Sequence, residues 1–232
     1  MDDEEIAKSA ALEQRHWWYA ERRALVRRTT SSWPRGRALD VGCAGGGNTA
    51  VLAELGWSTT GLEYSPAGVR IAASRGLDVL RGDATSMPFA DATFDLVMAT
   101  DVWEHIEDDH AVAAESARVL RPGGRALVAV PCSMKLWSGH DVALGHFRRY
   151  ERDELAAVVT GAGLVVDDVW SWNVLLRPVV RARRRKRNDS ESEMEPVSPV
   201  LNAGLRSAVA LERVLPLRRL PGVSLVVTAH KP

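Results

Sequence analysis

Residues 39–47 read Leu-Asp-Val-Gly-Cys-Ala-Gly-Gly-Gly, and this stretch decides the fold of the chain. The apolar run 38–41 predicts a buried strand, and residues 47–55 after the glycines predict a helix. Because glycine has no Cβ, the backbone of such a turn can approach a ligand closely and can adopt a positive φ. The helix N-terminus adds unpaired N–H groups and a partial positive charge. The pattern predicts a loop that holds a nucleotide-like or anionic small molecule; the alternative is a tight turn without a ligand.

Short apolar runs and helical stretches alternate along most of the chain. The further predicted strands are 59–63, 77–80, 94–99, 125–130, 164–170 and 223–229. The further predicted helices are 4–28, 66–75, 109–120, 151–160 and 199–214. Strands separated by helices predict βαβ units, and right-handed crossovers then place helices on both faces of a mostly parallel sheet.

Composition narrows the class of protein. The 232 residues are 46% hydrophobic and 26% charged, as in a soluble protein with one α/β domain. With 30 basic and 30 acidic residues the formal charge is zero, which argues against a generally basic nucleic-acid-binding protein. Two cysteines cannot build a disulfide framework or a thiolate zinc site. The chain has neither an apolar stretch of about 18 residues nor an apolar leader, so we expect a cytoplasmic protein.

Two acidic residues follow the next predicted strands. Glu63 closes strand 59–63, where a carboxylate can accept hydrogen bonds from ribose hydroxyls. Asp83 follows strand 77–80, where a carboxylate can accept a bond from an adenine amino group. Alternatively, Glu63 is a solvated strand-end acid and Asp83 belongs to an ordinary turn. The C-terminal ends of parallel strands are where open α/β sheets bind ligands, which favours a nucleotide site.

The order of these segments resembles the class I S-adenosylmethionine-dependent methyltransferases. The resemblance covers roughly residues 37–132 and departs at Ala44, where the family often has glycine. It implies a Rossmann-like α/β fold with a seven-stranded, mostly parallel sheet, helices on both faces and an antiparallel last strand. It also implies S-adenosylmethionine as the cofactor. The segments that carry it are the glycine loop, 61–63, 82–84, 94–97 and 120–124.

The resemblance implies a set of cofactor-binding residues. The glycine loop would pack on the methionyl part of the cofactor, and Glu63 would hold the ribose, with Tyr64 beside the adenine. Asp83 and the backbone of Ala84 would contact the adenine edge. The implied set is Asp40, Gly42, Ala44, Gly46, Glu63, Tyr64, Asp83, Ala84, Thr100 and Arg22.

The resemblance extends loosely over the whole chain and predicts a single domain. An N-terminal helix folds over the cofactor in similar methyltransferases, and Arg22 on such a lid can reach the cofactor carboxylate. The predicted parts are a helical lid over 1–36, a cofactor-binding core over 37–170, an insertion over 171–221 that is mobile near 185–197, and the last strand within 222–232.

Two loops at the predicted ligand-binding edge carry candidate catalytic histidines. Methyl transfer needs the nucleophile, methyl group and sulfur in line, and a base where the acceptor is a hydroxyl or a protonated amine. His105 follows strand 94–99, and His140 and His146 follow strand 125–130. We predict that the base is one of these three. Alternatively, Glu104 and His105 only brace their loop.

The same loops carry candidate acceptor-binding residues. An arginine there can clamp a carboxylate or phosphate of the acceptor. Alternatively, these residues cap helix 151–160 and pair with its acids. The predicted set is Trp103, Asp141, Arg148, Arg149 and Tyr150.

A metal site is the less favoured interpretation of the first loop. Asp101, Glu104 and His105 have a spacing that could hold a divalent cation, as some quinone-related members of the family do near this point. We predict no metal.

Residues 174–187 are apolar and then rich in arginine. This composition suits an anionic membrane surface, so we predict a peripheral membrane contact as one option. The alternative is a solvated basic face that the acidic run 189–195 neutralises. Nucleic acid is not expected as a partner, because the basic run lacks an RNA-binding module.

The sequence therefore predicts a methyltransferase, monomeric or homodimeric, that acts on an O- or N-nucleophile of a small-molecule or lipid/sugar-linked acceptor. One alternative is a non-catalytic cofactor-binding regulator or scaffold protein. A nicotinamide-dependent oxidoreductase is the other, because a glycine loop also suits a dinucleotide. Acceptor pockets are built from scattered side chains, so the pattern does not identify the acceptor.

Overall fold

A computed structural model describes residues 3–186 and 197–232. Its seven-stranded sheet has the order β3-β2-β1-β4-β5-β7-β6, with β7 antiparallel to both of its neighbours and the other pairs parallel. This confirms the predicted sheet. The strands are β1 Arg37–Val41, β2 Ser58–Glu63, β3 Val79–Arg81, β4 Phe94–Thr100, β5 Leu120–Pro131, β6 Val165–Trp172 and β7 Ser224–His230.

The helices are α1 Asp3–Leu12, α2 Trp17–Thr30, α3 Gly47–Glu54, α4 Pro66–Ser74, α5 Asp109–Val119, α6 Gly139–Ala143, α7 Arg152–Gly161, α8 Arg177–Lys186 and α9 Pro199–Glu212. Two 3₁₀ turns, η1 Trp103–His105 and η2 Met134–Leu136, follow β4 and β5. None of the helices in the described part of the chain has the length and apolarity that a membrane span requires. Most of the segment predicted as mobile, 187–196, lies outside the described residues.

The long helix predicted over 4–28 is wrong, because the chain forms two helices there. His16 has extended backbone angles, and its ring accepts a hydrogen bond from the backbone N–H of Trp18. A residue that caps a helix in this way cannot continue the preceding helix. Two smaller differences concern β3, which begins at Val79, and residues 121–124, which form an irregular start of β5.

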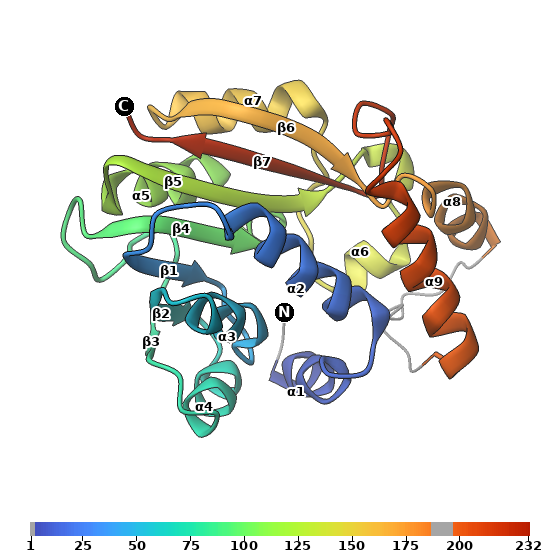
Figure 1. Cartoon of the computed structure of the whole chain (residues 1–232), viewed down its shortest axis with the longest axis horizontal. Helices are drawn as coiled ribbons and strands as arrows, with labels where there is room; N and C mark the ends of the chain where they lie inside the picture. Colours follow the sequence, from blue (N-terminus) through green and yellow to red (C-terminus); the bar gives the residue numbers. More distant parts are fainter. Residues whose placement is uncertain (1–2, 187–196) are drawn as a thin grey trace.

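The strands of the central sheet are buried on both faces. In β4, Leu96 and Met98 point to one core, while Val97 and Ala99 point to the other. Side chains alternate along a strand, so a strand between two helical layers must be apolar at nearly every position. Figure 1 shows α5 and α7 behind the sheet and α2 and α9 in front of it.

Tryptophan side chains pack helix α2 against the front face of the sheet. Trp18 on α2 contacts Trp172 at the end of β6, with ring centroids 5.1 Å apart. Large aromatic side chains contribute much of the buried apolar area in a core. As a result, α2 contacts α3 and α9 and lies across the sheet near the C-terminal ends of the central strands (Figure 1). The front core contains Trp17, Trp18, Trp33, Trp57, Trp170 and Trp172.

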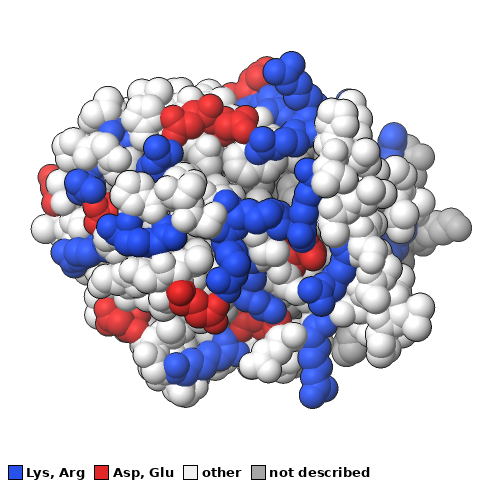
Figure 2. Space-filling view, viewed as in Figure 1, with Lys and Arg blue, Asp and Glu red and all other residues white. Residues whose placement is uncertain are grey.

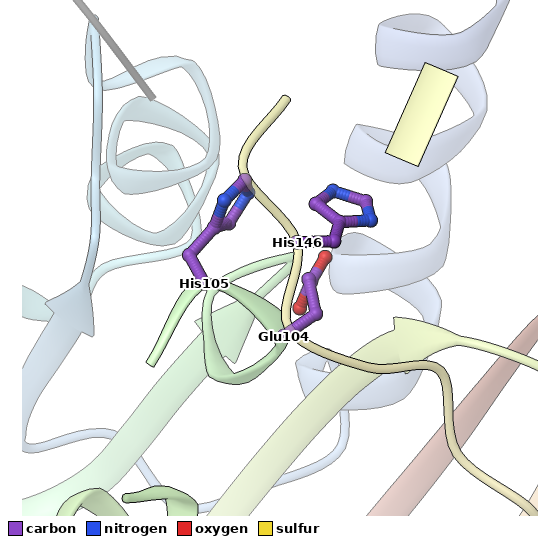
Figure 3. A group of neighbouring side chains, drawn as sticks. All are labelled: Glu104, His105 and His146. Atoms are coloured by element: carbon purple, nitrogen blue, oxygen red, sulfur yellow. The ribbon is translucent and has the colours of Figure 1, made fainter. Parts of the chain in front are cut away.

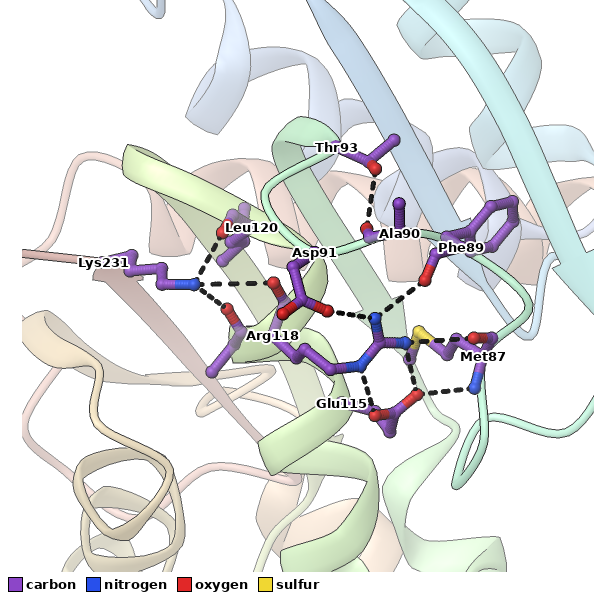
Figure 4. A network of polar contacts seen from close by, with 10 residues as sticks. Met87, Phe89, Ala90, Asp91, Thr93, Glu115, Arg118, Leu120 and Lys231 are labelled. Atoms are coloured by element: carbon purple, nitrogen blue, oxygen red, sulfur yellow. Dashed lines mark hydrogen bonds and ion pairs between the residues drawn. The ribbon is translucent and has the colours of Figure 1, made fainter.

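The N-terminal ends of β4 and β5 are closed by a set of ionic contacts that we call the Arg118 network (Figure 4). The Arg118 guanidinium donates hydrogen bonds to both carboxylate oxygens of Glu115 and to Asp91, at 2.6–2.8 Å. It also donates to the backbone carbonyls of Phe89 and Met87, at 2.7 and 3.0 Å. This edge of the sheet is held together by groups within the chain.

Candidate functional site

A cavity of about 1020 Å³ opens at the opposite edge, where β1, β2 and β4 end. Its walls include the glycine loop, the residues after β2 and β4, and parts of α2, α8 and α9. The C-terminal edge of an open α/β sheet is where such proteins bind ligands. Figure 2, which views the molecule from the side of α2 and α9, shows Lys and Arg side chains gathered in the middle of that face, with a few acidic side chains among them.

The glycine loop is tied to β2. The backbone N–H groups of Gly42 and Cys43 both donate to the carbonyl of Leu62, at 2.7 and 3.2 Å. Gly42 lines the cavity with a φ of 65°, in the left-handed region that favours glycine. Gly46, also predicted to contact the cofactor, does not line the cavity. It caps α3 with a φ of 83°, and a side chain there would collide with Leu77, so its role is to turn the chain.

Two buried carboxylates face the cavity beside this loop. Asp40 is 2% exposed, and burial, with a smaller contribution from Glu63, raises its pKa to about 7 despite a 2.6 Å hydrogen bond from Thr49. Glu63 accepts hydrogen bonds from the backbone N–H groups of Ala44 and Ser65, at 2.7 and 2.8 Å. A carboxylate offers about four lone-pair positions, so each acid can accept more bonds. The pair fits a ligand that brings a positive charge and hydroxyl groups, as an amino acid joined to a ribose does.

The remaining predicted cofactor residues line the same cavity. Tyr64, which is 71% exposed, lines the cavity together with Asp83 and Ala84. Thr100, at the end of β4, accepts a 3.0 Å hydrogen bond from the Asn48 side chain. Asn48 also lines the cavity, and no sequence motif identified it.

Arg22, which the sequence places on a predicted lid, lines the cavity from α2. Its guanidinium forms an ion pair with Asp101 and lies 5.3 Å from the centre of the Trp18 ring. Glu13, between α1 and α2, forms an ion pair with Arg75, which in turn donates to the carbonyl of Gly45 at 2.5 Å. These contacts hold the N-terminal helices against the glycine loop.

The far end of the cavity carries a group of four side chains that we call the polar cluster: Glu104, His105, His140 and His146. The rings of His105 and His146 are 4.6 Å apart, and those of His140 and His146 are 6.4 Å apart. Burial lowers the pKa of His105 to about 3 and raises the pKa of Glu104 to about 8. Without a ligand, therefore, this end of the cavity holds a neutral imidazole beside a carboxyl group that resists ionisation.

Asp141, predicted as an acceptor contact, lies behind His146 and is not among the residues that line the cavity. It is fully buried and accepts hydrogen bonds from His146 Nδ1 at 2.9 Å and Arg149 Nε at 2.7 Å. Burial alone would raise the pKa of Asp141, but the hydrogen bond from His146 and the charges of Arg149 and Arg184 outweigh it and hold that pKa well below its usual range. Asp141 thus fixes the orientation of His146.

Three other predicted acceptor contacts also lie outside the cavity wall. Trp103 is buried in the core between the sheet and α5, because η1 turns its side chain inward. The Tyr150 hydroxyl donates to Asp109 at 2.8 Å, and Arg148 forms an ion pair with the same carboxylate at 2.8 Å. These residues join the loop before α7 to the start of α5. Of the predicted acceptor set, Arg149 alone lines the cavity.

Part of the cavity wall comes from the insertion. Asn173 lines the cavity fully buried, and neither polar atom of its side-chain amide has a hydrogen-bond partner. Its position after a tryptophan-rich strand gave no signal. The apolar part of this wall is built by Leu176, Val179, Val180, Leu201 and Leu205 of α8, α9 and the chain just before α8. The helical spacing of Leu201 and Leu205 was visible in the sequence, but their position beside the site was not.

Comparisons with known proteins show similarity to methyltransferases. Residues 39–128 match the methyltransferase domain family. The chain is 29% identical over 161 residues to a protein of Mycolicibacterium smegmatis named "probable S-adenosylmethionine-dependent methyltransferase", with 68% of this chain and 63% of the relative covered. It is 34% identical to an uncharacterized methyltransferase of a Mycobacterium species, with 53% and 50% covered.

The chain spans 63% and 50% of the lengths of these two relatives. A solved SAM-dependent methyltransferase of Thermotoga maritima shares the fold, with a TM-score of 0.65, 18% identity and 99% and 96% of the two chains covered. Residues 39–128 thus match a methyltransferase domain, and the whole chain has the fold of a solved S-adenosylmethionine-dependent methyltransferase.

Proposed function

We propose that this protein is an S-adenosylmethionine-dependent methyltransferase that transfers a methyl group to an oxygen or nitrogen nucleophile of a small-molecule or lipid/sugar-linked acceptor with an apolar body. The observation that supports this most is continuity within one cavity. Asp40 and Glu63, the polar cluster, and the apolar residues of α8 and α9 all line this one cavity. The volume of about 1020 Å³ is at the upper end of the roughly 300–1,000 Å³ of ligand pockets, which suits two ligands side by side.

The residues around the glycine loop would hold the cofactor. The carboxylate of Asp40 would face the ammonium of the methionyl part, Glu63 would accept bonds from the ribose hydroxyls, and Asp83 would face the adenine. When bound, S-adenosylmethionine supplies a methyl group on a positively charged sulfur. The side chains of α2, among them Trp18 and Tyr19, would exclude water from that end of the cavity.

The polar cluster would receive the reacting group of the acceptor. A hydroxyl must lose a proton as its oxygen bonds to the methyl carbon, whereas an ammonium must lose one before its nitrogen can attack, and in both cases a neutral imidazole within reach can take that proton. His105, His140 and His146 all line the cavity and are the candidates for this base. Alignment of the acceptor by the surrounding wall would supply much of the remaining rate enhancement.

Binding of S-adenosylhomocysteine, measured by calorimetry with NADH as the comparison ligand, tests the cofactor assignment. We expect micromolar affinity for S-adenosylhomocysteine in the wild type and in Glu54→Gln, which alters an exposed acid on α3. We expect a large loss of affinity in Glu63→Gln. Binding of NADH in place of S-adenosylhomocysteine would overturn the proposal.

A methyl-transfer screen with labelled cofactor then tests the acceptor. Transfer to compounds that combine a hydroxyl or amine with an apolar body supports the proposed class. Tight cofactor binding with no transfer to any such compound would favour the alternative of a non-catalytic cofactor-binding protein.

We also propose that α8 and α9 lie against an anionic membrane surface when the acceptor is lipid-linked. Arg181 and Arg183 on α8 are exposed, and so are Val179 on the same helix and Val200 on α9. Basic residues beside exposed aliphatic ones suit the surface of an anionic bilayer. Flotation with vesicles that contain phosphatidylserine, compared with neutral vesicles, tests this; equal recovery with both would contradict it.

A further inference from the structure

Three members of the polar cluster converge on one point at the wall of the cavity. One carboxylate oxygen of Glu104 and one ring nitrogen each of His105 and His146 lie within 4.8 Å of one another. Glu104 and His105 come from η1 after β4, and His146 comes from the loop after α6 (Figure 3). Residues from two separate loops thus place three potential metal-binding atoms together.

Each histidine has one nitrogen held by the protein and one left over. His146 Nδ1 is hydrogen-bonded to Asp141, which leaves Nε2 as the second nitrogen. The backbone carbonyls of Leu144 and Gly145 contact the His105 ring, while its Nδ1 has no hydrogen-bond partner. A ring nitrogen that donates to a carboxylate or carbonyl leaves the other nitrogen with a bare lone pair. This is the arrangement that metal-binding histidines show.

Glu104 has no hydrogen-bond partner among the residues that the structure describes. Its side chain is 1% exposed, lines the cavity, and has no hydrogen-bond partner at either carboxylate oxygen. A buried carboxylate without a partner is costly, and proteins keep such groups paired or bound to metal. Asp101 cannot supply a fourth protein ligand in this arrangement, because it forms an ion pair with Arg22.

We propose that Glu104, His105 and His146 bind a divalent first-row transition metal ion at the acceptor end of the cavity. Two imidazoles and one carboxylate are a ligand set that such ions take, and three protein ligands leave positions open toward the cavity. This replaces the expectation of no metal drawn from the sequence. It also changes the ligand set suggested by spacing, with His146 in place of Asp101.

The role of the ion rests on the proposed function. An acceptor hydroxyl on an open position of the ion would have a lowered pKa. Its O–H bond would break with the proton passing to His140, the fourth member of the cluster. The oxygen–carbon bond would form as the methyl–sulfur bond breaks. The nearby charges of Arg149 and Arg184 are already engaged by Asp141, which limits their repulsion of a cation.

Cobalt binding to protein without a histidine tag tests the site. We would remove metal with a chelator and titrate Co²⁺, following the visible absorption of the ion and the heat of binding. We expect one equivalent to bind with a visible band. Glu104→Gln and His146→Gln should weaken binding at least tenfold, because each removes one of three ligands. His110→Ala, which removes an exposed histidine on α5, should bind like the wild type.

Binding of S-adenosylhomocysteine to the same samples separates the two proposals and shows that each variant is folded. Cofactor binding without stoichiometric Co²⁺ binding would overturn the metal site and leave the proposed function standing. Stoichiometric Co²⁺ binding without cofactor binding would support the metal site and overturn the proposed function. Equal Co²⁺ affinity in the wild type and in a folded Glu104→Gln would also overturn the site.

Discussion

The Arg118 network and the polar cluster lie at opposite ends of the strands of the same sheet, and they differ in whether their charged groups have hydrogen-bond partners. Arg118 meets two carboxylates and two backbone carbonyls at hydrogen-bond distance. Glu104 has no hydrogen-bond partner at either oxygen, although it is more deeply buried. A satisfied group stabilises the fold, whereas an unsatisfied buried group costs stability unless a ligand completes it. The contrast separates residues kept for structure from residues kept for binding.

The same contrast appears in the neighbours of each set. Beside Arg118, the Lys231 ammonium donates to the carbonyls of Ala117 and Leu120 at 2.8 Å, which satisfies the end of α5 (Figure 4). Beside Glu104, His105 Nδ1 also lacks a partner, and so do both amide atoms of Asn173 across the cavity. Among the described residues, the charged, imidazole and amide side chains with unpartnered buried atoms all line this cavity, whereas the unpartnered indole N–H groups of Trp57, Trp103 and Trp172 lie outside its wall.

The largest expected effect is on turnover. We expect His140→Ala to lower the rate of methyl transfer by about 10²–10⁴-fold, because it removes the proposed proton acceptor. Affinity for S-adenosylhomocysteine should stay within about threefold of wild type. Single-turnover kinetics with labelled cofactor would measure this. An unchanged rate would show that no base acts at this position.

A substitution in the Arg118 network tests the opposite end of the sheet. Arg118→Ala leaves Glu115 and two carbonyls without their donor, so we expect a loss of about 2 kcal/mol of unfolding free energy. For a chain of this size that lowers Tm by roughly 4–8 °C. Turnover per folded molecule should not change. Calorimetry and activity at 20 °C would measure both; a loss of turnover in the folded variant would break the contrast.

Asp40 predicts how cofactor affinity depends on pH. With its pKa raised to about 7 by burial, Asp40 carries a proton below that pH. A bound ammonium favours the carboxylate, so binding must release this proton at low pH. We therefore expect the affinity for S-adenosylhomocysteine to rise up to about tenfold from pH 6 to pH 8 and then level off. Asp40→Asn should bind more weakly with a flatter profile, and an equally steep profile there would assign the proton to another group.

The smallest expected effect is a gain in stability. In metal-free protein, Glu104→Leu removes a buried carboxyl group that has no partner, so we expect Tm to rise by roughly 2–4 °C, or about 1 kcal/mol. The matched variant is Glu21→Leu, because Glu21 is equally buried but is paired with Arg213. That variant should lose stability. A similar loss of stability in both variants would mean that the Glu104 carboxyl group has hydrogen-bond partners in the folded protein.

The sequence was informative where function depends on consecutive residues. A strand that runs into Gly42 and a helix N-terminus is a local pattern, and so are the acids that end β2 and follow β3. The order of helices and strands then follows from hydrophobic periodicity, because each element must bury one or both faces. Local pattern was less reliable at the N-terminus, where the cap formed by His16 depends on a side-chain hydrogen bond that periodicity does not register.

By itself the sequence predicted the mostly parallel sheet and the loops that lie at its ligand-binding edge, and the resemblance to a known family implied the antiparallel last strand. It could not determine which side chains on those loops face the cavity. Of eight candidates in two loops, four line the cavity, namely His105, His140, His146 and Arg149, and four do not, namely Trp103, Asp141, Arg148 and Tyr150. Strand positions follow from a repeating geometry, but loop orientations depend on contacts between residues far apart in the chain. Only the tertiary structure brings His146 beside Glu104, and Asp141 behind His146.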